Sequence, residues 1–278
     1  MNIWHKLKIA IMRCLIHTVG RTSDGIRISF DSGFVSGVML DYIYRNQPSG
    51  RFLIGRLFDK IYLSHRGWEV VRIRKSNLQR LLHEAISIQR KLRRRPVLLD
   101  VASGPSQYML DVLSADGMDD VQAICRDLDQ QSLELGRRKA AECGLSSVHF
   151  ESGDALSAAS LAEVEPRCNI AVSSGFYDWI ADDSIVQKSM SLLYDLLPNG
   201  GCFVFTNQSG HVDLEMINSI FVGSRGQPLR MVVRPTEVVN SWAEAQGFKI
   251  LQTTSDRWRH YSVTLTQKLL AKEVGEVG

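Results

Sequence analysis

After Pro96 the sequence alternates between short apolar runs and stretches with helical spacing, and this alternation constrains the fold more than any other feature. The runs predicted as strands cover residues 97–101, 121–125, 148–150, 170–173, 202–206, 249–252 and 261–266. Helical patterns near 108–115, 130–142, 185–197, 212–220 and 236–246 follow the strands. Such alternation predicts an α/β fold with a largely parallel sheet covered on both faces. The link 253–260 is too short for a crossover helix, so the last two strands are predicted to be antiparallel neighbours.

The sequence before Pro96 has a different character. It reads as helices separated by glycine-bearing loops, and residues 76–92 place apolar side chains at helical spacing. Pro96 ends that helix, so we predict an N-terminal helical region over 1–95 and an α/β core over 96–278.

Charge divides along the same line. Residues 1–95 carry 19 Lys and Arg against 6 Asp and Glu, and residues 96–278 carry 14 against 24. This asymmetry indicates a surface for a nucleic acid, a membrane or an anionic ligand, although simple attraction between the two parts would also explain it.

Composition excludes several classes of protein. With 44% hydrophobic and 23% charged residues, the chain is globular rather than disordered or fibrous. Its five cysteines are scattered without a C-x-x-C pair, which favours reduced thiols and a cytoplasmic location over a disulfide framework. No H-E-x-x-H pattern occurs, and no metal site is predicted.

Residues 3–16 are apolar but are interrupted by Lys6, Lys8 and Arg13. The segment is too short to span a bilayer, and no small-residue cleavage site follows it. It is predicted to be a basic amphipathic helix. One face either packs on the protein's own core or makes a weak contact with an anionic membrane surface, which would make the protein peripheral.

The most informative loop follows the first strand. Asp100 lies near the end of that strand, and the small residues Ala102, Ser103 and Gly104 come next. Small residues let the backbone approach a ligand, and the helix that follows offers free N–H groups. A dinucleotide loop would read G-x-G-x-x-G, whereas Gln107 occupies the third glycine position here. The pattern is typical of a loop that binds S-adenosylmethionine (SAM), in which the acid orients the methionine end.

Two further acids follow the next two strands. Asp127 is placed to accept hydrogen bonds from ribose hydroxyls, with Asp129 as second choice. Asp129 could instead cap the following helix. Asp154 could accept from the adenine amine or cap the helix after it. Three acids after three consecutive strands are a stronger indication than any one of them.

The fourth and fifth strands also end in polar residues. Tyr177 and Asp178 could position a substrate or accept a proton. Asn207 and Gln208 follow the fifth strand as candidate substrate contacts. His211, which titrates near neutral pH, is the first candidate for a general base.

Several stretches carry a resemblance to a known family. They are residues 44–56 (YRNQPSGRFLIGR), 62–75 (YLSHRGWEVVRIRK), 99–110 (LDVASGPSQYML), 172–177 (VSSGFY) and 205–217 (FTNQSGHVDLEMI). Over about residues 40–268 the chain resembles class I SAM-dependent methyltransferases found free-standing or fused to α/β-hydrolase or CDP-alcohol phosphatidyltransferase domains. The resemblance implies a seven-stranded, doubly wound, Rossmann-like core with an N-terminal helical cap. It also implies SAM binding and methyl transfer.

The chain departs from the family pattern at two places. The family loop reads D-I-A-A-G-H-G-R-Y, whereas Ser106 and Gln107 replace its second glycine and its arginine. After the fifth strand, Ser209-Gly210-His211 replaces P-W-H. The first change motivates one alternative, a SAM-binding subunit without transfer activity, and the second suggests an altered substrate pocket.

The predicted function is methyl transfer from SAM to an oxygen or nitrogen atom of a small metabolite of amphiphilic or anionic character. The alternatives are a membrane-lipid methyltransferase, an RNA methyltransferase and the non-catalytic subunit. Nucleic acid is disfavoured as a substrate because no N/D-P-P-Y/F motif follows the fourth strand, and a homodimer is left open. The predicted catalytic residues are His211, Tyr177 and Asp178. The predicted cofactor contacts are Asp100, Ala102, Ser103, Gly104, Tyr108, Asp127, Leu128, Asp154, Ala155, Ser174 and Gly175. The predicted substrate contacts are Tyr42, Tyr44, Arg45, Arg51, Asn207 and Gln208.

Overall fold

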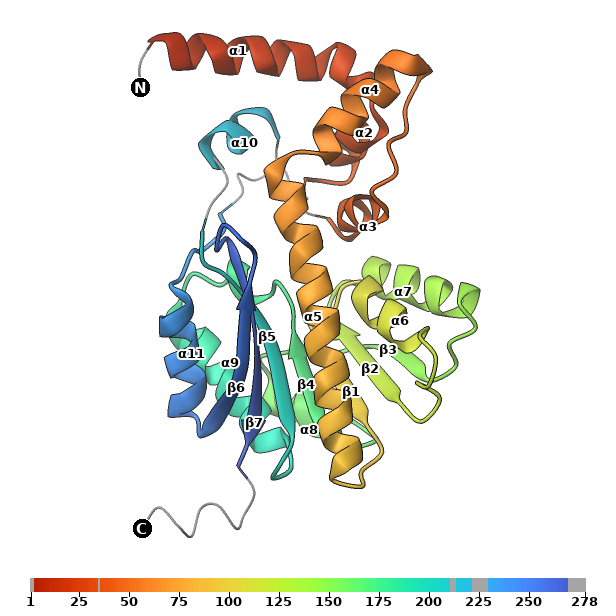
Figure 1. The fold of residues 1–278 in the computed structure, drawn as a ribbon, viewed down its shortest axis with the longest axis vertical. Coiled ribbons are helices and arrows are strands. Elements are labelled where there is room, and N and C mark those ends of the chain that lie inside the picture. The colour runs from red at the N-terminus through yellow and green to blue at the C-terminus, as the bar shows by residue number, and fades with distance from the viewer. Residues whose placement is uncertain (1–2, 35, 211–213, 222–229, 270–278) are drawn as a thin grey trace. The chain divides into compact units, whose positions relative to one another are not determined.

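The computed structural model describes residues 3–34, 36–210, 214–221 and 230–269 (Figure 1). The chain divides into two compact units. The first comprises Met1–Arg72 and His211–Met231, and the second comprises Ile73–Gly210 and Val232–Gly278. Helix α5 (Arg66–Lys91) begins in the first unit and ends in the second. The division into compact units falls inside α5, because the later turns of this helix bury their apolar side chains on the sheet.

The second unit is built on a seven-stranded sheet in the order β3-β2-β1-β4-β5-β7-β6. Its strands are β1 (Val97–Val101), β2 (Gln122–Asp127), β3 (Val148–Ser152), β4 (Ile170–Ser173), β5 (Cys202–Gln208), β6 (Phe248–Ser255) and β7 (Tyr261–Lys268). The first five are parallel, and β7 runs antiparallel to both β5 and β6. The predicted α/β fold and the antiparallel final pair are confirmed.

Helices cover both faces of this sheet. The later turns of α5, α6 (Gln107–Leu113) and α7 (Gln130–Glu142) pack on one face, in a core that includes Leu82 and Leu98. The other face, which includes Leu99, is covered by α8 (Ala158–Ala162), α9 (Asp183–Leu196) and α11 (Thr236–Ala245). Neighbouring strand residues such as Leu98 and Leu99 fall in different cores because successive side chains point to opposite faces. The central strands are therefore apolar throughout, and polar chemistry is confined to their ends.

The first unit is helical. It contains α1 (Ile3–His17), η1 (Val19–Thr22), α2 (Asp24–Asp31), α3 (Gly37–Arg45), α4 (Phe52–Leu63), the first turns of α5, and α10 (Leu214–Ile220). Its core contains a cluster of aromatic rings. The ring of Phe34 lies 4.6 Å from Trp68 and 4.8 Å from Phe221, and Tyr62 lies 5.6 Å from Trp68. Segments distant in sequence thus share one aromatic cluster, and Trp68 of the stretch 62–75 contributes to it.

No helix in the described ranges combines the length and the apolar character needed to cross a bilayer.

Candidate functional site

The loop after β1 bends through three residues with left-handed backbone. Ala102, Gly104 and Ser106 have φ angles of 51°, 56° and 47°. Such conformations are costly for side chains other than glycine, and they concentrate where a chain clamps a ligand. A Cβ added to Gly104 would meet no atom within 4 Å, so open space lies beside this residue. The loop therefore presents its backbone to that space, as the sequence predicts.

Asp100 is fully buried at the end of β1. One carboxylate oxygen accepts hydrogen bonds from the hydroxyl of Tyr108 at 2.6 Å and from the hydroxyl of Ser106. The other oxygen, Oδ1, is buried and has no hydrogen-bond partner among the described residues. Burial raises the pKa of this carboxyl to about 7, although the two hydroxyls oppose the rise. A buried carboxylate oxygen in need of a donor fits a cationic ammonium group, such as that of a methionine moiety.

Asp127, at the end of β2, ties the loop to its neighbouring strand. Its Oδ2 accepts the N–H of Gly104 at 2.7 Å, and its Oδ1 accepts the N–H of Asp129 at 2.9 Å. Each oxygen keeps a second lone pair, so a diol such as ribose could still donate to it. Asp129 itself caps α7 by accepting from the N–H groups of Gln131 and Ser132, which is the alternative predicted for it. Leu128 is exposed between the two acids and offers an apolar surface.

The acid after β3 also lies in an ordered turn. Asp154 Oδ1 accepts the N–H of Leu156 at 2.8 Å. Helix α8 is capped by Ser157, so the capping role considered for Asp154 is filled by another residue. Ala155 is buried in the core beneath. Arg126, which was not predicted as a site residue, holds the turn by donating to the carbonyl of Ser160 at 2.6 Å.

Polar groups at the ends of β4 and β5 are bonded to one another. Gly175 donates its N–H to Thr206 Oγ1 at 2.7 Å. Asp178 is buried, and its carboxylate accepts the N–H of Gln208 at 3.0 Å and faces the Arg74 guanidinium at 3.6 Å. Burial raises the pKa of Asp178 to about 6, while the charge of Arg74 opposes the rise. Arg74 was not predicted as a site residue, although it lies in the family-specific stretch 62–75.

A second unpredicted arginine orders the same edge. Arg234 donates to the carbonyl of Tyr177 at 2.9 Å, and its backbone N–H donates to the carbonyl of Gln208 at 3.0 Å. Its own carbonyl accepts from the side-chain amide of Asn207 at 2.9 Å. Asn207 and Gln208 are buried, so this geometry favours a positioning role over direct substrate contact.

The structure describes one of the two other predicted catalytic residues, Tyr177, and does not describe His211. Tyr177 is buried in the core with α9, and its hydroxyl lies 3.2 Å from Ser189 Oγ. Burial raises its pKa to about 12. The position favours packing over catalysis, because the ring is covered by α9 rather than presented at the strand ends. His211 lies outside the described residues.

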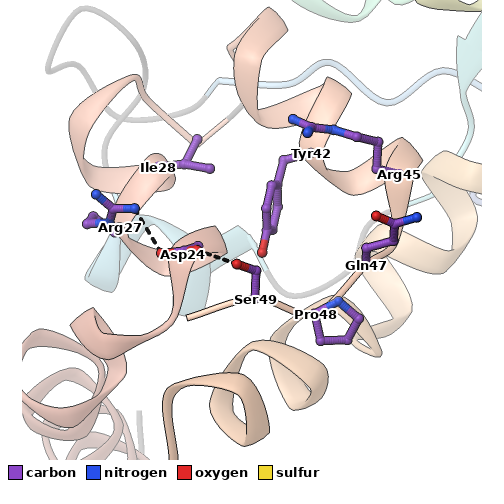
Figure 2. Close-up of a pocket in the computed structure, with 8 residues that line it drawn as sticks. All are labelled: Asp24, Arg27, Ile28, Tyr42, Arg45, Gln47, Pro48 and Ser49. Atoms are coloured by element: carbon purple, nitrogen blue, oxygen red, sulfur yellow. Dashed lines mark hydrogen bonds and ion pairs between the residues drawn. The ribbon is translucent and has the colours of Figure 1, made fainter. Parts of the chain in front are cut away.

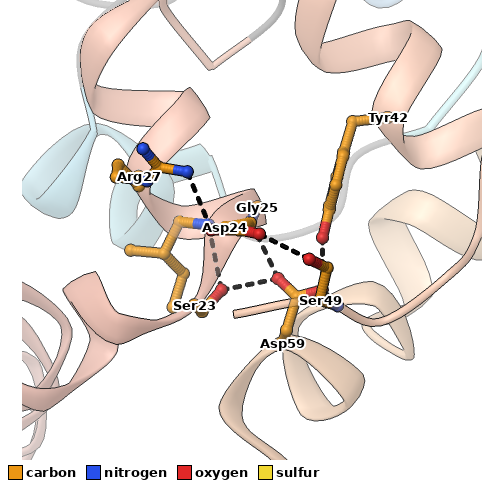
Figure 3. A network of polar contacts seen from close by, with 8 residues as sticks. Ser23, Asp24, Gly25, Arg27, Tyr42, Ser49 and Asp59 are labelled. Atoms are coloured by element: carbon orange, nitrogen blue, oxygen red, sulfur yellow. Dashed lines mark hydrogen bonds and ion pairs between the residues drawn. The ribbon is translucent and has the colours of Figure 1, made fainter. Parts of the chain in front are cut away.

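One predicted substrate residue near the N-terminus, Tyr42, contacts a buried carboxylate in the first unit (Figure 3). Asp59 Oδ1 accepts from the hydroxyl of Ser23 at 2.6 Å and the N–H of Gly25 at 2.8 Å. Its Oδ2 accepts from the hydroxyl of Tyr42 at 2.6 Å and the N–H of Ser49 at 2.9 Å. Four donors satisfy this buried charge and fix the start of α2 against the loop before α4. The Tyr42 hydroxyl therefore has a structural partner.

A pocket of about 430 Å³ adjoins this network (Figure 2). It is lined by Asp24, Arg27, Ile28, Tyr42, Arg45, Gln47, Pro48 and Ser49. Arg27 pairs with Asp24 at 2.8 Å, and Arg45 pairs with Asp41 at 3.0 Å. Two of the predicted substrate residues, Tyr42 and Arg45, thus line one pocket, whereas Tyr44 and Arg51 are not among its lining residues.

The basic side chains of α5 and the segment after it are largely engaged within the protein. Lys75 pairs with Asp111, Arg80 pairs with Glu84 at 2.8 Å, and Arg90 pairs with Asp120. Further donors bind backbone carbonyls: Arg72 to Leu63, Arg94 to Asn199 and Arg95 to Asp120. The charge excess of this region therefore serves internal contacts to a large extent. Among the residues that the structure describes, no group of three His, Cys, Asp or Glu side chains could hold a metal ion.

Residues 2–268 match the model of a family described as "Putative methyltransferase". The chain belongs to this methyltransferase family. It is 32% identical over 262 residues to the Escherichia coli "Uncharacterized protein YnbC". The match covers 93% of this chain and 44% of YnbC, so the chain spans less than half the length of that relative.

Solved structures share the fold. A protein of Bordetella parapertussis, described as possibly exported, has a TM-score of 0.69 at 20% identity, over 92% of this chain and 86% of its own. An O-methyltransferase family protein of Burkholderia thailandensis scores 0.54 at 11% identity, over 96% of both chains. Magnesium protoporphyrin IX methyltransferase of Synechocystis, solved with S-adenosylhomocysteine (SAH), scores 0.54 at 13% identity, over 85% and 97%. The family match confirms the predicted methyltransferase family, and the solved structures confirm the predicted fold.

Proposed function

We propose that this methyltransferase transfers the methyl group of SAM to an oxygen or nitrogen atom of a small anionic or amphiphilic molecule. The observation that supports SAM binding is the arrangement of Asp100, Gly104 and Asp127 at the ends of adjacent strands. Bound SAM supplies an electrophilic methyl group on a sulfonium centre. The chain's own residues bind it, orient it and align the acceptor.

In this proposal the unpartnered Oδ1 of Asp100 holds the ammonium group of the cofactor. Asp127, whose two oxygens are fixed by the N–H groups of Gly104 and Asp129, accepts from the ribose. Leu128 and Asp154 serve the adenine end. The preformed hydrogen bonds reduce the ordering that cofactor binding requires, which favours affinity.

Methyl transfer is a direct displacement, so a base is needed only where the acceptor must first lose a proton. Asp178, with a pKa of about 6, is ionised at neutral pH. The Gln208 N–H and Arg74 fix its carboxylate in place. Asp178 is therefore the best-supported candidate base among the described residues, and His211 stays a prediction.

Two features support the acceptor class. The pocket in the first unit is lined by the guanidinium groups of Arg27 and Arg45. Each pairs with one carboxylate, Asp24 or Asp41, and keeps further N–H donors that suit an anionic group. The basic residues around α5 make internal contacts instead of forming a row of unengaged charges, which argues against a nucleic-acid track. A membrane-lipid acceptor is a second candidate, favoured by exposed apolar side chains on α1 and α4.

The thiols of Cys14 and Cys143 are free and exposed, in keeping with the reducing cytoplasm that we propose as the location of this protein.

Calorimetry with SAH tests the cofactor half. We expect binding by the wild type and its loss in Asp100→Ala and Gly104→Val, the latter because a branched side chain fits poorly at a left-handed position. Formation of SAH from SAM with fractionated small-molecule extracts then tests transfer. Binding without turnover on any fraction would support the non-catalytic subunit instead. In the presence of an active fraction, Arg45→Gln should raise KM with little change in kcat.

A further inference from the structure

Helix α4 buries one face and leaves a second, apolar face exposed within the described chain. Gly55, Asp59 and Leu63 recur every four residues and are buried against the first unit. The opposite line of the helix carries Leu53 and Leu57 in the same spacing, with side chains 85% and 57% exposed. A helix places residues four apart on one face, so this second line points away from the core of its unit. The exposed apolar side chains of α4 are Phe52, Leu53, Ile54, Leu57 and Ile61.

Helix α1 repeats the feature. Its spacing places Trp4, Leu7, Ile11 and Leu15 in one stripe, and these side chains are 47–74% exposed. The sequence left open whether an apolar face of this helix packs on the core or contacts a membrane. This stripe is uncovered within the described chain, and α1 and α4 both pack against η1 in the same unit. Solvent-exposed large side chains at this density mark an interaction surface.

The exposed charged side chains of α4, those of Arg56 and Lys60, are both basic. Helix α1 contains no acid, and the only acid of α4 is the buried Asp59. Neither Arg56 nor Lys60 forms an ion pair within the described residues. Apolar side chains with a basic and acid-free border are the pattern of a helix lying in the headgroup region of an anionic bilayer.

We propose that α1 and α4 form a surface that docks the protein on membranes containing anionic lipids. The nine apolar side chains named above enter the headgroup and acyl boundary, and Arg56 and Lys60 meet lipid phosphates. This inference uses the first unit alone and does not depend on the proposed methyl acceptor.

A second copy of the chain is a less suitable occupant. Pairing this surface with itself would bring like charges together with no acid on either helix to compensate, which opposes association. An anionic lipid layer supplies both the apolar environment and the opposite charge.

The test is co-sedimentation of the full chain with vesicles of phosphatidylcholine alone or with 30% phosphatidylglycerol, in 0.1 M and 0.5 M salt. We expect binding to the anionic vesicles, weakened by high salt because salt screens exposed charges. The triple variant Leu53→Gln, Leu57→Gln and Ile61→Gln should reduce partitioning on the order of tenfold or more. Arg56→Gln and Lys60→Gln should each reduce anionic binding about fivefold. Leu251→Gln, at a leucine 38% exposed on β6 in the other unit, is the matched control and should bind as the wild type does.

Folding is checked by circular dichroism and by SAH binding, which the triple variant should retain because its substitutions lie on exposed positions. Failure of the wild type to bind either vesicle would overturn the proposal, as would equal binding by the triple variant. Sedimentation velocity measures whether the protein forms a dimer. A dimer that the triple variant abolishes, without lipid binding by the wild type, would assign the surface to a second copy and refute membrane docking.

Discussion

Replacing Asp100 with asparagine should stabilise the protein and weaken its cofactor binding at the same time. The carboxylate is buried at the end of β1, and one of its oxygens has no partner among the described residues. Asparagine keeps an oxygen that can accept from Tyr108 and Ser106, and it removes the charge. The variant therefore separates the cost of this buried charge from the packing of the side chain.

The expected magnitude follows from the pKa of Asp100. Burial raises it from 3.8 to about 7, so the folded state binds protons more tightly than the unfolded state does. Stability must then fall as pH rises through this window, and at pH 8 the ionised carboxylate costs the folded state about 4 kcal/mol. Between pH 5 and pH 8 the wild type should lose about 3 kcal/mol from this group. Asp100→Asn should be more stable than the wild type at pH 8, and its free energy of unfolding should vary less with pH.

Urea denaturation at pH 5 and pH 8 without cofactor measures this difference. Asp116→Asn, at an exposed acid in the same unit, is the control and should leave the pH dependence unchanged. Calorimetry should show SAH bound at least roughly tenfold more weakly by Asp100→Asn, because a hydrogen-bonded charge partner is lost. Wild-type affinity should rise from pH 6 to pH 8 as the carboxyl ionises. A variant less stable than the wild type at pH 8, with undiminished SAH affinity, would refute the reasoning.

Three further predictions concern other buried groups. Asp59→Ala strands four donors, so urea denaturation should show the first unit destabilised by about 3–5 kcal/mol, and a loss below 1 kcal/mol would contradict the network's role. Gly25→Ala should lower the free energy of unfolding by about 2–3 kcal/mol in the same assay. A Cβ at this position would lie 2.8 Å from Asp59 Oδ1 and 2.9 Å from an atom of Tyr42. An unchanged stability would show that these side chains can shift without cost. Arg74→Gln should raise the pKa of Asp178 above about 6. Its destabilisation, roughly 2 kcal/mol at pH 8, should shrink at pH 5, where the carboxyl is protonated, and an equal loss at both pH values would exclude the pairing.

Much of the second unit could be predicted from sequence because its strands are short apolar runs with clear ends. Strands β1 and β4 and helix α7 begin and end where the pattern places them. Helix α8 was missed because its five residues are too few to establish a period. Local rules therefore suffice for long elements with strong patterns, and they fail for single turns.

The candidate cofactor residues could be located from the sequence only where they directly follow a strand end. Asp100 and Asp127 lie in such positions, and the structure links both to the loop between them. The positioning roles of Arg126 and Arg234 could not be predicted, because most of their hydrogen bonds go to backbone carbonyl groups. Every residue has such a group, so the sequence does not indicate which ones will bind an arginine. Tyr177 was placed correctly along the chain, but its burial depends on where α9 packs, and that is set by tertiary structure.

The aromatic cluster of the first unit has a consequence for how this protein can be varied. Phe221 lies more than a hundred residues after Phe34 and Trp68, yet the three rings share one cluster. The helical unit is therefore not a detachable N-terminal cassette. A chimera between relatives that exchanged only residues 1–72 would pair one parent's Phe34 with the other parent's Phe221. Recombination should preserve folding only when residues 1–72 and 211–231 come from the same parent. Substitutions in one of these segments are therefore expected to be matched by substitutions in the other, despite their separation along the chain.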